Sequence, residues 1–319
     1  MKNSAQVAAT VGAAVWAGIA VAARMGVVRI GAIELMFLFG PLVVVPLGME
    51  LGRMISGIGR LEKWGRRLQP AGALFAVAAL CVPPGKRAGV VALGWMVVCM
   101  LMAGAGALDL LLSSWPDEGA RATFIAPFIV AVGRIDLAVG GAWLVASRFG
   151  MRPMGIQEPI GLLTAVHFHF AGFATATIAA ATLQAPENGG GKQRWLMRLC
   201  YLVAGMPFVV AVGFVISPVL KMGAAIVFSA SVAGLAIFLR ARGRRAHDGG
   251  ARILLQIAAG AIFAGMVLSG AYAVADFMRS EALTIPQMAR THGILNALGF
   301  CLTGLLGWIV ERNSSQRQW

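Results

Sequence analysis

Charged residues are scarce in this chain. Only 13% of its 319 residues are charged, whereas 59% are hydrophobic. A soluble domain is typically about a quarter charged and about half apolar, so this composition excludes an ordinary water-soluble globule. In lipid, every backbone polar group must be paired internally, which leaves helices and closed barrels. The apolar runs are continuous and do not alternate with polar residues, and this pattern predicts transmembrane helices.

Acidic residues are rarer still. The chain has 13 Asp and Glu against 27 Lys and Arg, for a net charge of +14. In a soluble protein this excess would indicate a nucleic-acid partner. Here the basic residues lie in short loops between apolar runs, with few aromatic residues among them. We therefore interpret them as topology signals that also contact membrane lipids with anionic headgroups, and we expect no nucleic-acid partner.

Cysteine is also sparse, and nothing in its placement suggests a bridge or a thiolate site. The four cysteines lie in or beside apolar runs, and none forms a close pair in the sequence. We interpret them as small core residues. The sequence also contains no phosphate-binding glycine loop, serine nucleophile elbow or haem-attachment motif.

The apolar runs predict an all-α, polytopic transmembrane helix bundle with about ten spans in a single domain, residues 1–319. A spanning helix needs about 20 apolar residues. The third run is short and the seventh and eighth are separated only by a turn near Pro218, so nine or eleven spans are alternatives. The expected spans are 5–23, 30–51, 68–84, 88–112, 122–147, 156–183, 196–217, 219–239, 253–276 and 288–310.

The basic residues give an orientation for these spans. With ten helices, the loops on one side carry 17 Lys and Arg and those on the other carry 9, and Arg134 lies inside a span. Lys and Arg favour the cytoplasmic side. The bias therefore supports the count of ten and predicts that both the N-terminus and the C-terminus are cytoplasmic.

Two pairs of features suggest an internal repeat. Pro41 and Pro207 each precede valine residues and are 166 positions apart, while Asp109 and Asp276 are 167 positions apart. These near-equal offsets suggest a five-plus-five arrangement, which would be inverted because each half has an odd number of helices. Chance is the alternative, since valine beside proline is common in membrane helices.

Ionisable residues inside a membrane are costly, and each is a functional hypothesis. The sequence places nine in or at the edges of the expected spans: Glu34, Asp109, Arg134, Asp136, Glu158, His167, His169, Asp276 and His292. Arg134 and Asp136 are two residues apart and do not face each other on a helix, so each needs a partner elsewhere.

The densest of these positions is His167-Phe168-His169 in the middle of the sixth expected span. Residues two apart on a regular helix point about 200° apart. The two imidazoles therefore face one site only if the helix unwinds locally. One could bind a ligand or carry protons while the other bonds a neighbouring helix, or both could simply be satisfied by interhelical hydrogen bonds.

Glu34 precedes a helix segment that contains Pro41 and Pro46. Proline frees backbone carbonyls, which at membrane depth either meet neighbours or line a cavity. A carboxylate about two turns away is a candidate proton or cation site. Alternatively, Glu34 lies at the interface and pairs with Arg29 or Arg24.

His292 and Asn296 are four apart and share a helix face. This polar stripe indicates either a binding site or interhelical hydrogen bonding. We expect Glu34, His167, His169, His292 and Asn296 to converge in one buried pocket that binds substrate or protons, with Asp109 as a further member. His167, His169 and His292 with one carboxylate would also suit a transition metal by ligand type, although their spacing is not a recognised metal signature.

Three stretches carry a resemblance to a known family. They are 158–173, which contains the two histidines, 33–48, which contains Glu34 and the prolines, and 292–300. Together they resemble the YndJ-like family of bacterial polytopic membrane proteins. The resemblance implies a polytopic bacterial membrane protein, which we expect in the cytoplasmic (inner) membrane. It implies no established activity; the family is sometimes labelled transporter-like.

Two classes of function fit these patterns. The first is a small-solute transporter, proton-coupled through Glu34 and the histidines, because imidazole titrates near neutral pH. The alternative is a membrane-embedded enzyme on a lipophilic substrate, with Glu34 or a histidine as general acid or base, with or without a metal. An accessory subunit whose polar residues only hold helices together is a third. The sequence selects no substrate and does not decide whether the protein is an enzyme.

Overall fold

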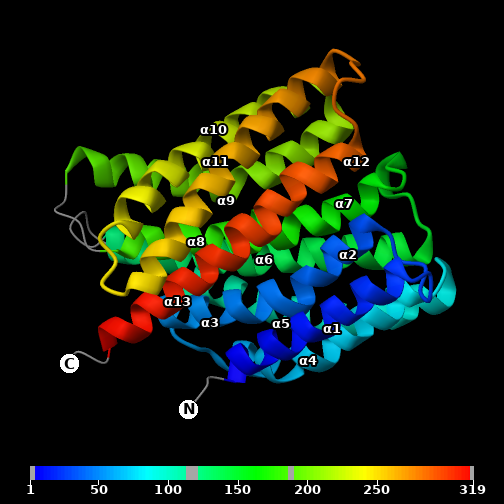
Figure 1. Cartoon of the computed structure of the whole chain (residues 1–319), viewed down its shortest axis with the longest axis horizontal. Coiled ribbons are helices and arrows are strands. Elements are labelled where there is room, and N and C mark those ends of the chain that lie inside the picture. The colour runs from blue at the N-terminus through cyan, green and yellow to red at the C-terminus, as the bar shows by residue number, and fades with distance from the viewer. Residues whose placement is uncertain (1–3, 113–120, 186–189, 317–319) are drawn as a thin grey trace. The chain divides into compact units, whose positions relative to one another are not determined.

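The computed structural model describes residues 4–112, 121–185 and 190–316, and all the regular structure in these ranges is helical (Figure 1). This confirms the all-α polytopic fold, with ten long helical runs. Several runs change helix type along their length. The elements are α1 Ser4–Arg24, α2 Ala32–Phe39, η1 Gly40–Val44, α3 Val45–Ser56, α4 Arg60–Cys81, α5 Lys86–Leu112, α6 Arg121–Phe149, η3 Pro153–Gly155, α7 Ile160–His167, η4 Phe168–Ala174, α8 Thr175–Gln184, α9 Gly191–Ile216, α10 Pro218–Gly243, α11 Gly249–Phe277, α12 Ile285–Met288, η5 Ala289–Gly293, η6 Leu295–Leu302 and α13 Thr303–Gln316.

Within the described ranges, nine helical runs are long and apolar enough to cross a membrane. The tenth run is α4, which coincides with the expected third span but begins eight residues earlier, at Arg60. Its first two turns contain four basic residues and one acid, whereas the apolar stretch 68–81 is about 21 Å long at the α-helical rise. That is shorter than the roughly 30 Å hydrocarbon core.

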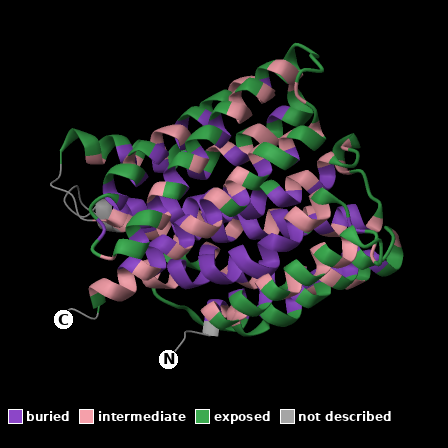
Figure 2. Cartoon of the chain, in the orientation of Figure 1, coloured by how far each residue is buried: buried purple, intermediate pink, exposed green. Residues whose placement is uncertain are grey.

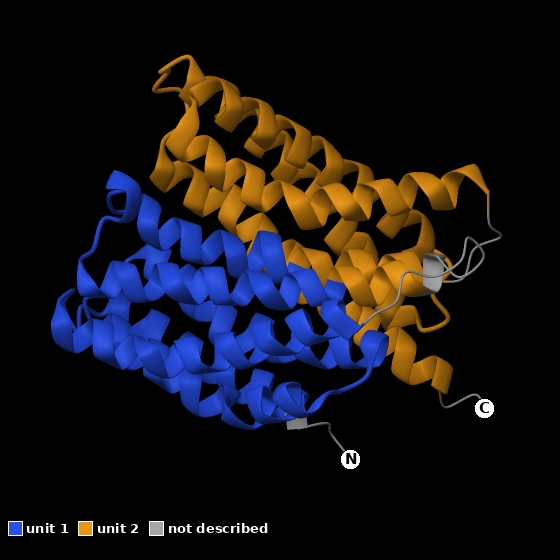
Figure 3. Cartoon of the chain, turned by 180° about the vertical axis from the view of Figure 1, so that it is seen from behind, with its two compact units in different colours: residues 1–114, 130–174 blue, residues 115–129, 175–319 orange. Residues whose placement is uncertain are grey.

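The chain divides into two compact units, which are coloured separately in Figure 3. Unit 1 comprises Met1–Ser114 and Val130–Ala174, and unit 2 comprises Trp115–Ile129 and Thr175–Trp319. One division falls inside α6 and another between η4 and α8. These divisions do not coincide with a split after the fifth helix, and the expected single domain and five-plus-five repeat stay predictions.

The run α2–η1–α3 is largely buried in unit 1. Every residue from 37 to 52 is buried, as expected of a helix that is hydrophobic on all sides. Helix α1 packs on η1 and α3, α2 packs on α7, and α4 lies beside α5 (Figure 1).

In unit 2, α8 is buried along residues 175–183 and contacts α9, α10 and α13. Helices α9, α10 and α11 pack in sequence order, and α11 also contacts η6 and α13. Many large apolar residues of α9, α10 and α11 are exposed, as expected of helices that contact lipid. Figure 2 colours the exposed residues of these helices green.

Four segments of the described chain are π-helical: η1, η4, η5 and η6. Such segments are rare in α-helices and are frequent at functional sites. In η1 the cause is local, because Pro41 has no N–H to donate. The carbonyl of Pro41 accepts a 2.6 Å hydrogen bond from Nε2 of the buried Gln69 on α4, so this carbonyl meets a neighbouring helix.

Candidate functional site

The first feature of the site is the buried carboxyl of Asp136 on α6. Asp136 is fully buried, and within the described chain no hydrogen-bond donor reaches either of its oxygens. It faces η4 at Gly172, where an added Cβ would lie 2.7 Å from Asp136 Oδ2. The missing side chain of Gly172 therefore allows η4 to pack directly on this carboxyl.

The second feature is His169, which lies three residues before Gly172 on η4 and is also fully buried. Its Nδ1 is 2.8 Å from the carbonyl oxygen of Ala165, and the indole N–H of Trp95 donates to its Nε2 at 3.0 Å. A carbonyl only accepts and an indole N–H only donates. Hence Nδ1 carries the hydrogen, Nε2 is the acceptor, and the imidazole of His169 is neutral.

Close packing holds His169 in this orientation. Its ring stacks on Trp95 with centroids 5.8 Å apart, and Phe37 meets it edge-on at 5.1 Å. A Cβ added at Gly140 on α6 would lie 2.6 Å from Nδ1, and one at Gly40 on η1 would lie 3.5 Å from the Cβ of His169. The imidazole of His169, on the π-helical segment η4, is therefore packed between α6 and the other π-helical segment of unit 1, η1.

The third feature is an ion network around Arg134. Its guanidinium bonds Asp109 at 2.5 Å, Glu62 at 2.6 Å and the hydroxyl of Ser56 at 3.0 Å. The Arg134 side chain is 3% exposed, that of Glu62 is fully buried, and that of Asp109 is 46% exposed. The network ties the end of α3, the start of α4 and the end of α5 to the middle of α6.

A second buried acid, Glu50 on α3, extends this network. Its carboxylate bonds Arg53 at 2.6 Å and Arg66 at 2.5 Å, and the charges of both arginines also act on Glu62. Three carboxylates are thus balanced by three arginines. Such pairing is needed for charges in a low-dielectric interior, because leaving one partner uncompensated is strongly destabilising.

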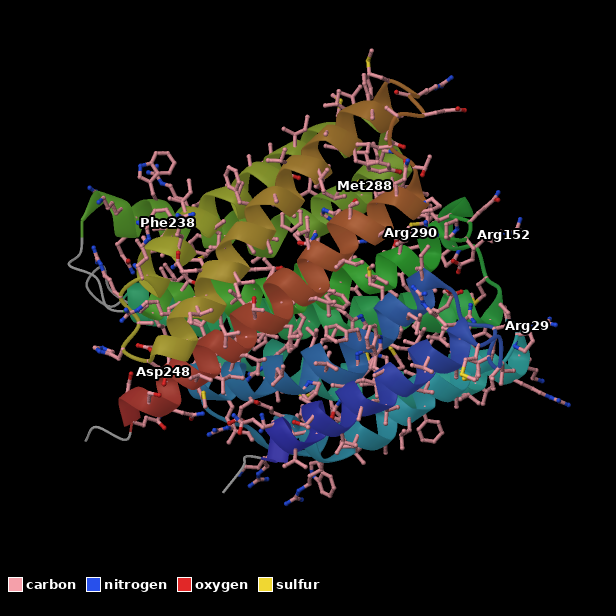
Figure 4. The ribbon with its side chains drawn as sticks, in the orientation of Figure 1. Arg29, Arg152, Phe238, Asp248, Met288 and Arg290 are labelled. Carbon is pink, nitrogen blue, oxygen red and sulfur yellow. The ribbon has the colours of Figure 1, made fainter. Side chains whose placement is uncertain are left out.

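A third group of charges surrounds Arg148, which is buried near the end of α6 and interacts electrostatically with Glu158 and Glu34. Glu158 accepts the backbone N–H of Leu162 at 3.2 Å, in the first turn of α7. Glu34 is half-buried in the first turn of α2. Within the described chain no ion pair joins Glu34 to Arg24 or Arg29; Arg29 is exposed in the loop before α2 (Figure 4).

In unit 2, His292 and Asn296 contact each other. Asn296 donates its side-chain amide to Nε2 of His292 at 3.0 Å, and Nδ1 of His292 is 2.8 Å from the carbonyl oxygen of Gly265 on α11. By the same reasoning as for His169, Nδ1 of His292 carries the hydrogen. Each of these two imidazoles thus bonds a backbone carbonyl through Nδ1 and a neutral N–H donor through Nε2.

The expected site residues have separate surroundings. In the described part of unit 1, no hydrogen bond or ion pair joins Glu34, Asp109, His167 and His169 to one another. His167 is exposed, and its Nδ1 bonds the carbonyl of Leu163 at 2.7 Å. Because the two remaining members, His292 and Asn296, belong to unit 2, the convergence of all six in one pocket stays a prediction.

Asp136 is not among the site residues that the sequence predicts. Its two-residue spacing from Arg134 predicts only that the two do not face each other and that each needs a partner elsewhere. In the described chain Arg134 finds three partners and Asp136 finds none. The available signal was this two-residue spacing, which sends the carboxyl to a different helix face from the guanidinium.

The metal hypothesis gains no support from these surroundings. Within the described residues, no three His, Cys, Asp or Glu side chains are grouped as metal ligands. His169 and His292 also have both ring nitrogens in hydrogen bonds. A metal held by His167, His169 and His292 therefore stays an untested prediction.

These features define the class: a polytopic, all-α integral membrane protein with buried ionisable groups inside its bundle. Residues 35–300 match the family described as YndJ-like protein, and the chain belongs to this family. It is 28% identical over 242 residues to the "Uncharacterized membrane protein YndJ" of Bacillus subtilis (strain 168). The alignment covers 76% of this chain and 41% of that relative, so the chain spans about two fifths of the relative's length. No solved structure matches the chain.

Proposed function

We propose that this protein is a proton-coupled transporter of a small solute and that Asp136 is its proton-binding carboxyl. The observation that supports the proposal is the full burial of Asp136 with no hydrogen-bond donor from the described chain. Burying an isolated carboxylate costs far more than burying the neutral acid. Asp136 therefore holds a proton in this conformation.

A carboxyl of this kind can couple proton movement to a conformational change. It is neutral while it is buried, and it ionises when its surroundings open to water, so protonation favours the closed state. Intramembrane acids of proton-driven transporters use this property. Asp136 packs against Gly172 of η4, a π-helical segment, and a change of helix register there would uncover the carboxyl.

The ion-paired acids of unit 1 are less suited to this task. Glu62 and Asp109 share the charge of Arg134, and Glu50 is bonded by two arginines. Carboxylates that are tied to fixed cations hold helices together. Of the originally expected residues, Glu34 and the histidines stay proposed members of the solute or proton pathway.

The enzyme alternative requires an imidazole or carboxylate with a free site aimed at a substrate. His169 and His292 offer no such nitrogen, because both are hydrogen-bonded at each ring position. Asp136 does have a carboxyl without a hydrogen-bond donor, but its full burial keeps a substrate away from it in this conformation. We therefore favour the transporter, and His167 stays the candidate acid or base of the enzyme alternative.

The proposal is tested in proteoliposomes that contain a pH-sensitive dye. Sugars, amino acids, organic acids and organic cations are added outside in turn, and acidification or alkalisation of the lumen is recorded. Asp136→Asn should abolish solute-driven proton movement but keep exchange of labelled solute across the membrane. The matched control is Asp276→Asn, since Asp276 is 35% exposed and paired with Lys221. Proton movement that survives in Asp136→Asn, or a wild type that moves no proton with any solute, contradicts the proposal.

We also propose a bacterial inner-membrane location with both termini in the cytoplasm. The support is the excess of basic residues on one set of loops and the even number of long helical runs. This requires α4 to cross the membrane.

Reporters fused after Gly59 and after Gly85, which flank α4, should therefore read opposite sides. Reporters after Arg67 and after Arg245 should both read cytoplasmic. Equal readings on the two sides of α4 would leave nine crossings and place the termini on opposite sides.

A further inference from the structure

One face of α4 is exposed and positively charged. Arg60, Lys63, Trp64 and Arg67 follow the spacing i, i+3, i+4 and i+7, which places them on one side of a helix. All four are exposed in the described chain. The acid in this segment, Glu62, points to the opposite side, where it is buried against Arg134. The exposed face therefore carries three positive charges and no acid.

An aromatic ring lies within this cationic face. The Trp64 side chain is 54% exposed, and the guanidinium of Arg67 lies over its ring, 5.2 Å from the centroid. Tryptophan is enriched at the level of lipid headgroups, and arginine and lysine near helix ends extend their charges to the same level. This combination indicates that the first two turns of α4 lie at the membrane–water interface.

The same face becomes apolar along the helix. Leu68 is 40% exposed, Leu74 58% and Phe75 49%. At the helical rise of about 1.5 Å per residue, Phe75 lies about 12 Å beyond Arg67 along the axis. Cations followed by an apolar strip along one face match a lipid that has a charged headgroup and an acyl chain.

We propose that this face of α4, formed by Arg60, Lys63, Trp64, Arg67, Leu68, Leu74 and Phe75, binds an anionic phospholipid. Its phosphate lies among the three cations, Trp64 lies at the glycerol level, and one acyl chain follows the apolar strip. The lipid would also complete α4 as a membrane helix, because its apolar stretch is shorter than the hydrocarbon core and headgroup contacts compensate for this mismatch. This binding site is independent of the proposed proton site.

Net charge decides between lipid classes. A zwitterionic headgroup such as phosphatidylcholine carries its own cation, so three protein cations have little preference for it. Phosphatidylglycerol has an uncompensated negative charge and is attracted to a basic cluster at the membrane surface. Salt screens exposed charges, so the preference should weaken as ionic strength rises.

The test uses quenching of Trp64 fluorescence by lipids brominated on their acyl chains. The full-length protein is placed in nanodiscs of phosphatidylcholine and phosphatidylglycerol in equal amounts, with matched chains. In one sample only the phosphatidylglycerol is brominated, and in the other only the phosphatidylcholine. The fluorescence of Trp64 is obtained by subtracting the fluorescence of the Trp64→Phe variant from that of the wild type. We expect brominated phosphatidylglycerol to quench Trp64 at least twofold more than brominated phosphatidylcholine.

The charge-removing variant is Arg60→Gln/Lys63→Gln/Arg67→Gln, which should lose this preference. The matched control is Arg240→Gln/Arg244→Gln/Arg245→Gln, which removes the same charge from exposed residues of unit 2 and should keep it. Equal quenching by the two lipids in the wild type overturns the proposal, whatever the stability of the variants. A preference that survives loss of the three α4 cations also overturns it.

Discussion

Trp95 donates its indole N–H to Nε2 of the buried His169 at 3.0 Å, across 74 positions of sequence. With Ala165 accepting the hydrogen on Nδ1, both nitrogens of this imidazole are satisfied. If Nε2 were protonated, its N–H would point at the indole N–H of Trp95, and neither group could accept a hydrogen bond. The pair therefore holds His169 neutral, and it joins α5 to η4.

Trp95→Phe should destabilise the protein by about 1–3 kcal/mol, because it leaves a buried ring nitrogen without its donor while most of the aromatic packing remains. Denaturant titration of the protein in detergent measures this loss in the free energy of unfolding. The control is Trp195→Phe, whose side chain is 60% exposed and which should change stability little. Equal effects of the two substitutions would show that the hydrogen bond to His169 contributes nothing.

Arg134→Gln should destabilise the protein by about 3–5 kcal/mol, since it removes the ion-pair partner of the fully buried Glu62. The double variant Glu62→Gln/Arg134→Gln should lose less than the single one, because no buried charge then remains unpaired. Arg53→Gln is the control: Arg53 is 36% exposed and Glu50 keeps Arg66. A double variant less stable than Arg134→Gln would contradict this interpretation of the network.

Gly172→Ala tests the packing of η4 on Asp136. The new methyl would lie 2.7 Å from Oδ2 of Asp136, and overpacking of this kind typically costs about 1–3 kcal/mol. Gly205→Ala on α9 has nothing within 4 Å of the added carbon. It should be neutral or stabilising by up to about 1 kcal/mol, because alanine favours helices over glycine. Thermal unfolding of the two variants in the same detergent measures both changes. Equal stability of the two variants would contradict close packing at Gly172.

Asp248 supplies a pH-dependent contribution in unit 2. It caps α11 by accepting the N–H of Ala251 at 2.9 Å, and it accepts the hydroxyl of Ser314 on α13 at 3.1 Å. The backbone hydrogen bond, and then that of Ser314, hold the pKa of Asp248 below its usual range. A carboxyl with a lower pKa in the folded chain stabilises the fold above its unfolded pKa, about 3.9. That stability is lost as pH falls through the folded pKa.

Stability curves of wild type and Asp248→Asn should therefore differ most at neutral pH. The gap should begin to close as the pH falls below about 4, the unfolded pKa, and should be lost as the pH falls through the lower folded pKa of the wild-type carboxyl. A gap that stays constant from neutral to acidic pH would show that the charge of Asp248 is not involved.

The lengths of the apolar runs predicted where the long helices lie along the chain. The expected span 156–183 corresponds to the continuous run Ile160–Gln184, and 288–310 lies inside Ile285–Gln316. The start of α4 was missed because its first turns are charged. They are held by partners on α3 and α6, and a search for apolar runs does not detect such partners.

The π-helical segments and the pairing of the charges were also beyond prediction. Glu62 and Arg134 are 72 positions apart, and their contact depends on how four helices pack. The sequence did predict that Asp136 and Arg134 face different directions. That Arg134 would find three partners and Asp136 none depends on which helices cover each face, and in particular on Gly172 of η4.

The central claim, a proton on the buried carboxyl of Asp136, is tested most directly by infrared spectroscopy of the purified protein at neutral pH. A protonated carboxylic acid has a carbonyl stretching band that a carboxylate lacks. The wild-type minus Asp136→Asn difference spectrum should contain this band, and the wild-type minus Asp276→Asn spectrum should not. A difference spectrum for Asp136 that shows carboxylate bands and no carboxylic acid band would mean that the residue is ionised, which would contradict the account.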